Sequence, residues 1–309
     1  MLKTRGQKIF SIFNIQFMII LSFIMLYPFW YTIIYSLNDG NNSVQGGMYW
    51  WPRVFTIDNY IKLFEAYNIR GAYIVTLARV AVGPILTVSV TLIIAYAMNT
   101  PGLLYRKIYT YIIIIPMFFS GGLIPYFLNI QNLGLYNNFW VYIFPRLFVA
   151  WNFLMMHAYM NNVPYELQES ARIDGAGELT IVFRIILPIC LPICACLLLF
   201  EAVSHWNAWF DSYIFNDRPE LYTMQLTLKN VIANIRRLID LIEEQGKMMG
   251  VTMSPQEHQM FVDNFRASGV TNESVLAAAS IISIGPIIFL YPFLQRYFIK
   301  GIMIGSLKG

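Results

Sequence analysis

Long apolar runs separated by short polar segments are the main feature of this chain. The runs cover roughly residues 13–36, 73–98, 108–128, 138–160, 188–210 and 275–295. Each run is long enough for the ~20 residues with which an α-helix crosses a lipid bilayer. The pattern therefore predicts an all-α, polytopic membrane protein with six transmembrane helices and with both termini on the same side of the membrane.

The composition agrees with this prediction. Of the 309 residues, 57% are hydrophobic and 12% are charged, whereas about 25% of the residues of soluble domains are charged. Pro116, Pro125 and Pro145 interrupt the third and fourth runs, but neighbouring helices can satisfy the backbone groups that a proline frees. The net charge of +4 is accounted for by the flanks of the runs, so it gives no argument for nucleic-acid binding.

Basic residues beside the runs predict the orientation. They stand in the N-terminal segment, in the turn after the second run and in the C-terminal tail: Lys3, Arg5, Lys8, Arg106, Lys107, Arg296, Lys300 and Lys308. Because short loops rich in Lys and Arg remain in the cytoplasm, we expect both termini to be cytoplasmic. A removable signal peptide is the alternative for the first run. No small-x-small cleavage site follows it, and the run is long and aromatic, so we expect it to stay as a span.

The polar segment before the fifth run predicts a helix-turn-helix at the cytoplasmic surface. Asn161 or Asn162 can cap a short helix, and Pro164 fits the first turn of that helix. Asp174-Gly175 ends it, because glycine tolerates the left-handed conformation of a C-terminal cap. A second, apolar helix is expected from about Thr180 onward.

This segment, residues 161–188, resembles the EAA loop of ABC transporter permeases, in the branch that imports carbohydrates and includes the maltose permeases. The matching residues are Glu166-Leu167, Glu169-Ser170-Ala171, Ile173-Asp174-Gly175-Ala176, Phe183, Ile185–Pro188 and Pro192. Ser170 replaces the more usual alanine, a small-for-small change. Trp51-Pro52, Trp206-Asn207 and the tail from Tyr297, which ends in Leu-Lys-Gly, are similar to the same family. An ordinary cytoplasmic loop would leave the spacing of Glu, Gly and Pro unexplained.

The resemblance implies a type I ABC importer transmembrane domain. The chain would be a transport subunit rather than an enzyme, and would import a sugar, in particular an oligosaccharide, across the bacterial plasma membrane. Its partners would be a second permease subunit, two ATPase subunits or domains, and an external solute-binding protein. ATP and Mg would bind to the ATPase, and this chain would bind no cofactor. In that family the loop inserts into a groove on the ATPase, which makes these the coupling residues: Glu166, Glu169, Ala171, Asp174, Gly175 and Ala176.

We expect three parts along the chain. Residues 1–71 form the N-terminal span and an external segment, residues 72–296 form the importer core, and residues 297–309 form a cytoplasmic tail. The core includes the cytoplasmic loop 161–188 and a long external loop, 211–272. In the external segment, aromatic and aliphatic residues at helical spacing predict an interfacial helix: Ile57, Tyr60, Ile61 and Phe64.

The long external loop contains a second amphipathic pattern, at about residues 228–245. Its apolar positions recur every three or four residues: Val231, Ile235, Leu238, Ile239 and Ile242. Arg236, Arg237 and Asp240 occupy other faces of the same helix. The resemblance implies that this loop contacts the solute-binding protein, which makes these three charged residues the candidate contacts. A lid that packs on its own transporter is the alternative.

Recognition of sugar needs flat aromatic rings against apolar sugar faces and amide groups for the hydroxyls. Several residues near the middle or outer ends of the core runs fit this need: Trp151, Asn152, Trp206, Asn207, Trp209, Tyr126 and Asn129. We expect the substrate pathway among them, although each residue also suits helix packing or an interfacial position.

Ionisable residues inside membrane spans are costly and mark functional sites. Arg79, Arg146 and Glu201 lie within apolar runs, and we expect an ion pair or a polar cavity wall rather than a proton relay, because no chain of acids continues across the membrane. The cysteines of the fifth run are expected to pack as small apolar residues: Cys190, Cys194 and Cys196.

Other function classes find little support in the sequence. It contains no Walker A pattern, no nucleophile elbow and no His-Glu-x-x-His motif, so neither ATP binding by a P-loop nor a clustered catalytic set of a membrane enzyme is predicted. An ion-coupled secondary transporter would show inverted repeats with broken Gly/Pro helices, which we do not find. Within the ABC class, a peptide or amino-acid permease is the nearest alternative.

Overall fold

The computed structural model describes residues 4–234, 271 and 273–285. These residues form helices, and no β-sheet forms among them, which confirms the all-α class. The helices are α1 (Arg5–Ser36), α2 (Gly40–Val44), α3 (Asp58–Ala66), α4 (Ile69–Asn99), α5 (Arg106–Ile114), α6 (Leu123–Asn132), α7 (Ala150–Met160), α8 (Glu166–Ile173), α9 (Glu178–Ile181), α10 (Leu187–Asn207) and α11 (Phe210–Phe215). Residues 224–234 and Glu273–Gly285 are also helical.

Three of the described segments are long and apolar enough to cross a membrane. They are Gly6–Ser36, Ile69–Asn99 and Glu178–Asn207, in agreement with the first, second and fifth predicted runs. The fourth run forms two shorter helical pieces, Phe139–Arg146 and Ala150–Met160, which meet at a bend of 46° and together would make a further span. The count of six spans stays a prediction, because the sixth run lies partly outside the described residues.

The third predicted run is divided rather than continuous. α5 passes into a short 3₁₀ turn, η1 (Ile115–Met117), and α6 begins only at Leu123. Pro116 has no N–H to continue the α-helical hydrogen bonds, and Gly122 adopts a φ of +87°, a conformation open to glycine. Sequence length alone therefore overstated the continuity of this run.

The chain divides into two compact units, and each is described by itself. The first comprises the described residues of Met1–Tyr67 and Leu228–Ile284, with Asn59 of α3 at its centre. The Asn59 side chain is fully buried; its amide donates to the carbonyls of Ser36 and Asn38, each at 2.9 Å, and its oxygen accepts from Ser274 at 2.7 Å. This amide therefore connects α1, α3 and the Glu273–Gly285 helix.

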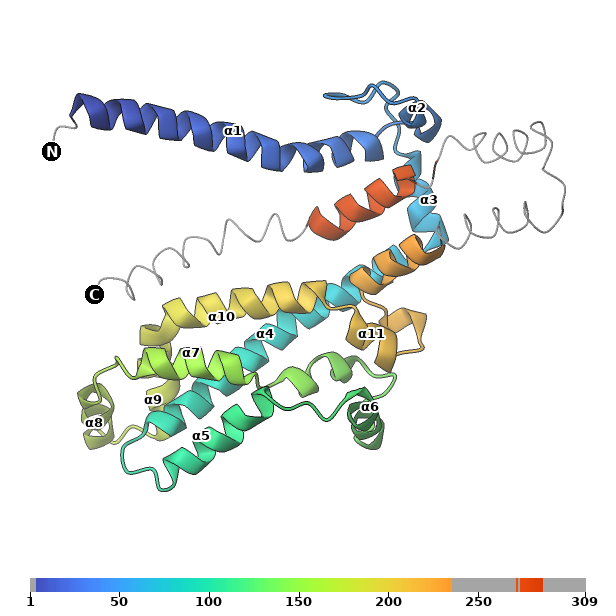
Figure 1. Cartoon of the computed structure of the whole chain (residues 1–309). Helices are drawn as coiled ribbons and strands as arrows, with labels where there is room; N and C mark the ends of the chain where they lie inside the picture. The colour runs from blue at the N-terminus through green and yellow to red at the C-terminus, as the bar shows by residue number, and fades with distance from the viewer. Residues whose placement is uncertain (1–3, 235–270, 272, 286–309) are drawn as a thin grey trace. The chain divides into compact units, whose positions relative to one another are not determined.

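The second unit comprises the described residues of Asn68–Thr227 and Gly285–Gly309. In it, α4 packs against both α7 and α10 (Figure 1). Their buried contacts include Val88, Leu92, Ala95, Phe153, Met156, Ile186, Cys190, Cys194 and Leu197. Cys190 and Cys194 thus pack as small apolar residues, as predicted. Ala171 of α8 and Ile181 of α9 join the same core, so the core holds the helix-turn-helix in place.

Candidate functional site

The segment 161–188 folds as the predicted helix-turn-helix. α8 ends at Ile173 with Asp174 as its C-cap, and the φ of +81° at the following Gly175 confirms the predicted left-handed conformation. The N–H of Ala176 donates to the carbonyl of Ala171 at 2.9 Å, which satisfies one of the free carbonyls at the helix end. α9 follows, and a π-helical turn, η4 (Val182–Ile186), leads into α10.

The predicted cap of α8 is wrong. The N–H of Asn161 donates to the carbonyl of His157 at 3.1 Å and ends α7, while the Asn162 amide donates to the carbonyl of Ala158. α8 begins later than expected, at Glu166, and no side chain caps it. Both asparagines therefore lie too far upstream to reach its free N–H groups.

The six predicted coupling residues divide into an inner and an outer set. Ala171 is buried and Ala176 is half-buried against the core of α4, α7 and α10. The other four are exposed: Glu166, Glu169, Asp174 and Gly175. Two apolar side chains, Leu167 and Ile173, are also exposed on α8, at 44% and 81%. The loop thus presents an acidic surface with apolar side chains in it, while its inner residues anchor it.

A polar cluster that sequence reasoning missed fastens α8 to its neighbours. The Arg172 guanidinium donates to both carboxylate oxygens of Glu178, at 2.9 and 3.2 Å, to the hydroxyl of Tyr165 at 2.6 Å and to that of Tyr96 at 3.0 Å. The Tyr96 hydroxyl in turn donates to Glu178. The hydrogen bonds to Glu178 raise the pKa of Arg172 above its usual value. An Arg and a Glu on either side of a Gly turn were the only signal in the sequence.

A buried ion pair joins α4 to α11. The side chain of Arg79 is fully buried and donates to both carboxylate oxygens of Asp211, at 3.2 and 2.5 Å. Its Nε donates to His205 Nδ1 at 3.4 Å, and its guanidinium lies 4.5 Å from the centre of the Tyr142 ring. Arg79 is therefore held in an ion pair, one of the two arrangements that the sequence favoured.

A second polar group lies between η3 (Phe144–Arg146), α7 and α10. Arg146 donates to Ser204 at 2.7 Å and pairs with Glu201 at 3.4 Å. The other oxygen of Glu201 accepts from the Asn152 amide at 2.8 Å. Glu201 and Asn152 are buried, whereas a third of the Arg146 side chain is exposed. Arg146 thus belongs to a buried network and also reaches a surface.

The exposed part of Arg146 lines a cavity of about 310 Å³. It is lined by Tyr126, Val141, Pro145, Arg146, Asn207, Ala208, Trp209, Phe210, Asp211 and Phe215. Three of the predicted substrate-pathway residues, Tyr126, Asn207 and Trp209, therefore meet at one place. The cavity offers aromatic rings, an amide, a cation and a carboxylate, which is the mixture that sugar recognition needs.

The remaining predicted pathway residues lie elsewhere. Trp206 is 1% exposed and packs edge-on against Tyr73, with ring centres 6.1 Å apart. Asn152 is occupied by Glu201, while Trp151 and Asn129 are exposed but do not line the cavity. The predicted contacts to the binding protein fall outside the described residues: Arg236, Arg237 and Asp240.

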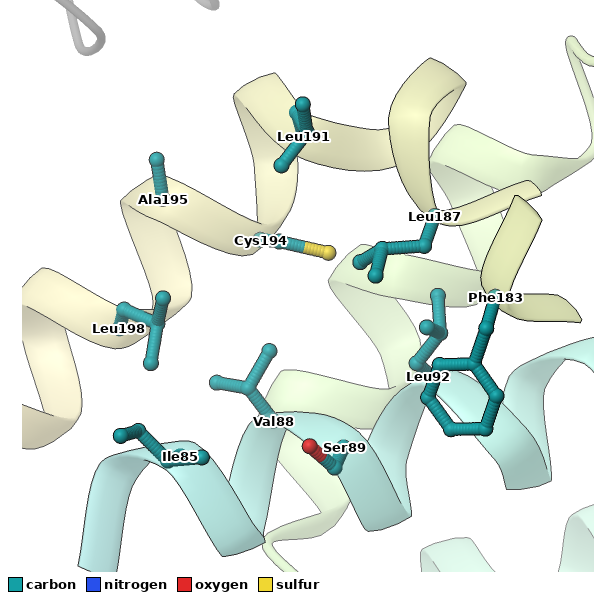
Figure 2. Close-up of a pocket in the computed structure, with 10 residues that line it drawn as sticks. All are labelled: Ile85, Val88, Ser89, Leu92, Phe183, Leu187, Leu191, Cys194, Ala195 and Leu198. Atoms are coloured by element: carbon teal, nitrogen blue, oxygen red, sulfur yellow. The ribbon is translucent and has the colours of Figure 1, made fainter. Parts of the chain in front are cut away.

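A second cavity, of about 280 Å³, lies between α4, η4 and α10 (Figure 2). Its lining is Ile85, Val88, Ser89, Leu92, Phe183, Leu187, Leu191, Cys194, Ala195 and Leu198. The only polar group of this lining besides the Cys194 thiol is the Ser89 hydroxyl, so the cavity lacks the amide and charged groups that hold sugar hydroxyls. We therefore place the candidate pathway at the polar cavity.

Comparison with known proteins places these features in context. No family model matches the chain. Protein LplC of Bacillus subtilis (strain 168) is 29% identical over 306 residues, which is 99% of this chain and 97% of that protein. The polygalacturonan/rhamnogalacturonan transport system permease protein YtcP of the same organism is 27% identical over 98% of this chain and 99% of that protein.

A solved structure is also similar to this chain over almost its whole length. It is the crystal structure of a bacterial ABC transporter involved in the import of the acidic polysaccharide alginate; the matching chain is 27% identical, with a TM-score of 0.76 over 96% of this chain and 99% of that chain. The fold, the helix-turn-helix at 161–188 and the full-length relatives agree with one another. The chain is an ABC importer permease, related over nearly its whole length to permeases of carbohydrate transporters.

Proposed function

We propose that this chain forms half of the translocation pathway of an ATP-driven, binding-protein-dependent importer of oligosaccharide. It works beside a second permease subunit, two ATPase subunits or domains and an external solute-binding protein, in the bacterial plasma membrane with both termini cytoplasmic. The observation that carries the proposal is the helix-turn-helix at 161–188, fixed to the core at Ala171 and exposed at its acidic residues. An exposed loop that is anchored in the core in this way suits a partner that pushes on it.

The proposed substrate is an oligosaccharide, for two reasons. YtcP is named as a permease for polygalacturonan and rhamnogalacturonan, and the solved relative imports alginate. The cavity at Tyr126, Asn207 and Trp209 places aromatic rings beside an amide, and such surfaces bind the apolar faces and hydroxyls of sugars. A peptide or amino acid as substrate is the alternative.

The proposed mechanism is alternating access driven by the ATPase. ATP and Mg bind to the ATPase partner, whose closure moves α8 because α8 seats in a groove on that partner. The loop acts as a lever that passes this movement to α4, α7 and α10, since Ala171 and Ile181 pack in their shared core. The helices then open the cavity to one side of the membrane and close it to the other.

The test is a substitution at the left-handed turn. Gly175→Val places a β-branched residue at a φ of +81° and should strain the turn by about 1–3 kcal/mol. Glu169→Lys reverses a charge on the exposed face of α8. In both variants we expect uptake of oligosaccharide to fall severalfold while the complex still assembles.

The matched control is Gly177→Val. Gly177 has a φ of −72°, and no atom lies within 4 Å of the position its Cβ would take, so a side chain fits there without strain. Uptake should remain near the level of the unmodified importer. Full uptake in both Gly175→Val and Glu169→Lys would remove the coupling role of the loop, and uptake of peptides instead of sugars would replace the substrate class.

A further inference from the structure

The turn between α8 and α9 is a weak mechanical connection. It consists of residues 174–177, and no atom lies within 4 Å of the positions where a Cβ at Gly175 or Gly177 would stand. Glycine has the greatest backbone freedom of any residue. If movement of α8 reached the membrane helices only through this turn, part of it would be absorbed there.

The cluster around Arg172 bridges this turn by a second route. We name the four residues Arg172, Glu178, Tyr165 and Tyr96 the α8 clamp. Arg172 contacts Glu178 on the far side of the turn and Tyr165 at the start of α8, while Tyr96 belongs to the last turn of α4. Tyr96 is 6% exposed and packs in the core with Ala171. The clamp therefore ties both ends of α8 to the end of α4.

The composition of the clamp suits positioning more than stability. The Arg172 and Glu178 side chains are 27% and 60% exposed, and exposed ion pairs contribute little to folding. A guanidinium is planar and presents several donors in fixed directions, so one side chain can hold three partners in one geometry. This arrangement fixes the direction of α8 relative to α4 without requiring a deeply buried charge.

We propose that Arg172 is a positioning residue that couples α8 directly to α4. When the ATPase moves α8, α4 follows through Arg172 and Tyr96 rather than through the turn at 174–177. The proposal rests on the coupling role proposed above for α8. It adds that α4 is the first membrane helix to receive the movement, and that the clamp stays closed throughout the transport cycle.

The experiment measures whether α8 and α4 move as one body. Spin labels are attached at Ala97→Cys on α4 and Ile173→Cys on α8, both at exposed positions. The importer is purified as a whole complex through a tag on this chain. The distance between the labels is measured without nucleotide and after trapping with ATP and vanadate. With the clamp intact, we expect one narrow distance that is the same in both states.

Two variants open the clamp. Arg172→Ala removes its centre, and Tyr96→Phe removes only the hydroxyl that reaches Arg172 and Glu178. In each we expect a second, different distance after trapping, together with a loss of uptake per ATP hydrolysed of about tenfold, a typical size for coupling between sites. The control is Lys107→Ala, which changes an exposed cation in the neighbouring helix α5 and should leave the single distance unchanged.

The outcomes separate this inference from the function on which it rests. A single unchanged distance in both variants would overturn the clamp, as would a change of distance on trapping when the clamp is intact. Because Tyr96→Phe deletes one oxygen, failure of Arg172→Ala to assemble does not block the test. A complex that retains no ATPase partner would instead contradict the proposed coupling function itself.

Discussion

At the scale of single residues, Gly83 sets how closely α4 and α10 approach. A Cβ at this position would lie 2.5 Å from Nε2 of His205. His205 is fully buried, and its other ring nitrogen accepts from Arg79, so the ring cannot move aside without disturbing the buried ion pair of Arg79 and Asp211. Only glycine fits this contact.

Gly83→Ala should therefore destabilise the permease. Alanine gains about 1 kcal/mol in helix propensity over glycine, but overpacking of a buried site costs about 1–3 kcal/mol, and displacement of His205 adds to that cost. We expect a lower unfolding midpoint for the purified complex in detergent. The control Gly6→Ala, in α1 with no atom within 4 Å of the new Cβ, should keep or raise the midpoint. An unchanged midpoint for Gly83→Ala would show that the contact is not rigid.

Gly175 and Gly83 show which single residues the sequence could identify. Gly175 was predictable because a local pattern, a short amphipathic helix followed by Asp-Gly, requires a left-handed residue. Gly83 was not, because its role depends on a histidine from a distant part of the chain. Arg172 was missed for the same reason, since its partner Tyr96 lies on another helix.

At the scale of elements, the Arg79–Asp211 pair holds α11 against α4. Asp211→Asn would leave a fully buried guanidinium without its counter-charge, and breaking a buried pair in this way costs about 3–5 kcal/mol. The lower end applies here, because the Asp211 side chain is 21% exposed. We expect a clear loss of thermal stability of the complex. The control is Asp217→Asn, at an exposed carboxylate that accepts a hydrogen bond from the Tyr136 hydroxyl. It should cost less than about 1 kcal/mol of stability. Equal losses of stability in Asp211→Asn and Asp217→Asn would contradict this account.

The elements themselves were largely predictable from apolar length. α4 and α10 follow the second and fifth runs to within a few residues, and α1 ends with the first run but begins earlier, at Arg5. The division of the third run could not be predicted from apolar length, because a proline and a left-handed glycine divide it and hydropathy carries no information on backbone geometry. The π-helical turn at Val182–Ile186 also left no signal, because hydropathy does not distinguish a π-helical turn from an α-helical one.

At the scale of the whole molecule, the orientation can be tested by chemical labelling. The basic flanks predict that the α8–α9 turn is cytoplasmic. A cysteine at Gly177 is exposed and should react with an impermeant maleimide only after cells are opened, whereas one at Ser254, in the predicted external loop, should react in intact cells. Labelling of Gly177→Cys in intact cells, with Ser254→Cys protected, would invert the topology.

The candidate sites, like the fold, could be predicted from the sequence only where their geometry is local. Motif spacing predicted the helix-turn-helix at 161–188, because its geometry is local. The polar cavity was predicted only in part: Tyr126, Asn207 and Trp209 line it, while Trp206 turns into the core and Asn152 serves Glu201. Sequence chemistry identifies residues able to contact sugar, but helix rotation decides which of them face the cavity.

The exposure of α1 has a consequence for how the protein is made. The most apolar window of Gly6–Ser36 contains no buried residue, whereas 44% of the corresponding window of Ile69–Asn99 is buried. The backbone hydrogen bonds of so apolar a helix are satisfied within the helix, so it is stable in lipid before any other helix packs against it. We therefore expect α1 to enter the bilayer as a complete span before α4 has been made. We expect α4, α7 and α10, which share a core, to reach their final packing only after all three have been made.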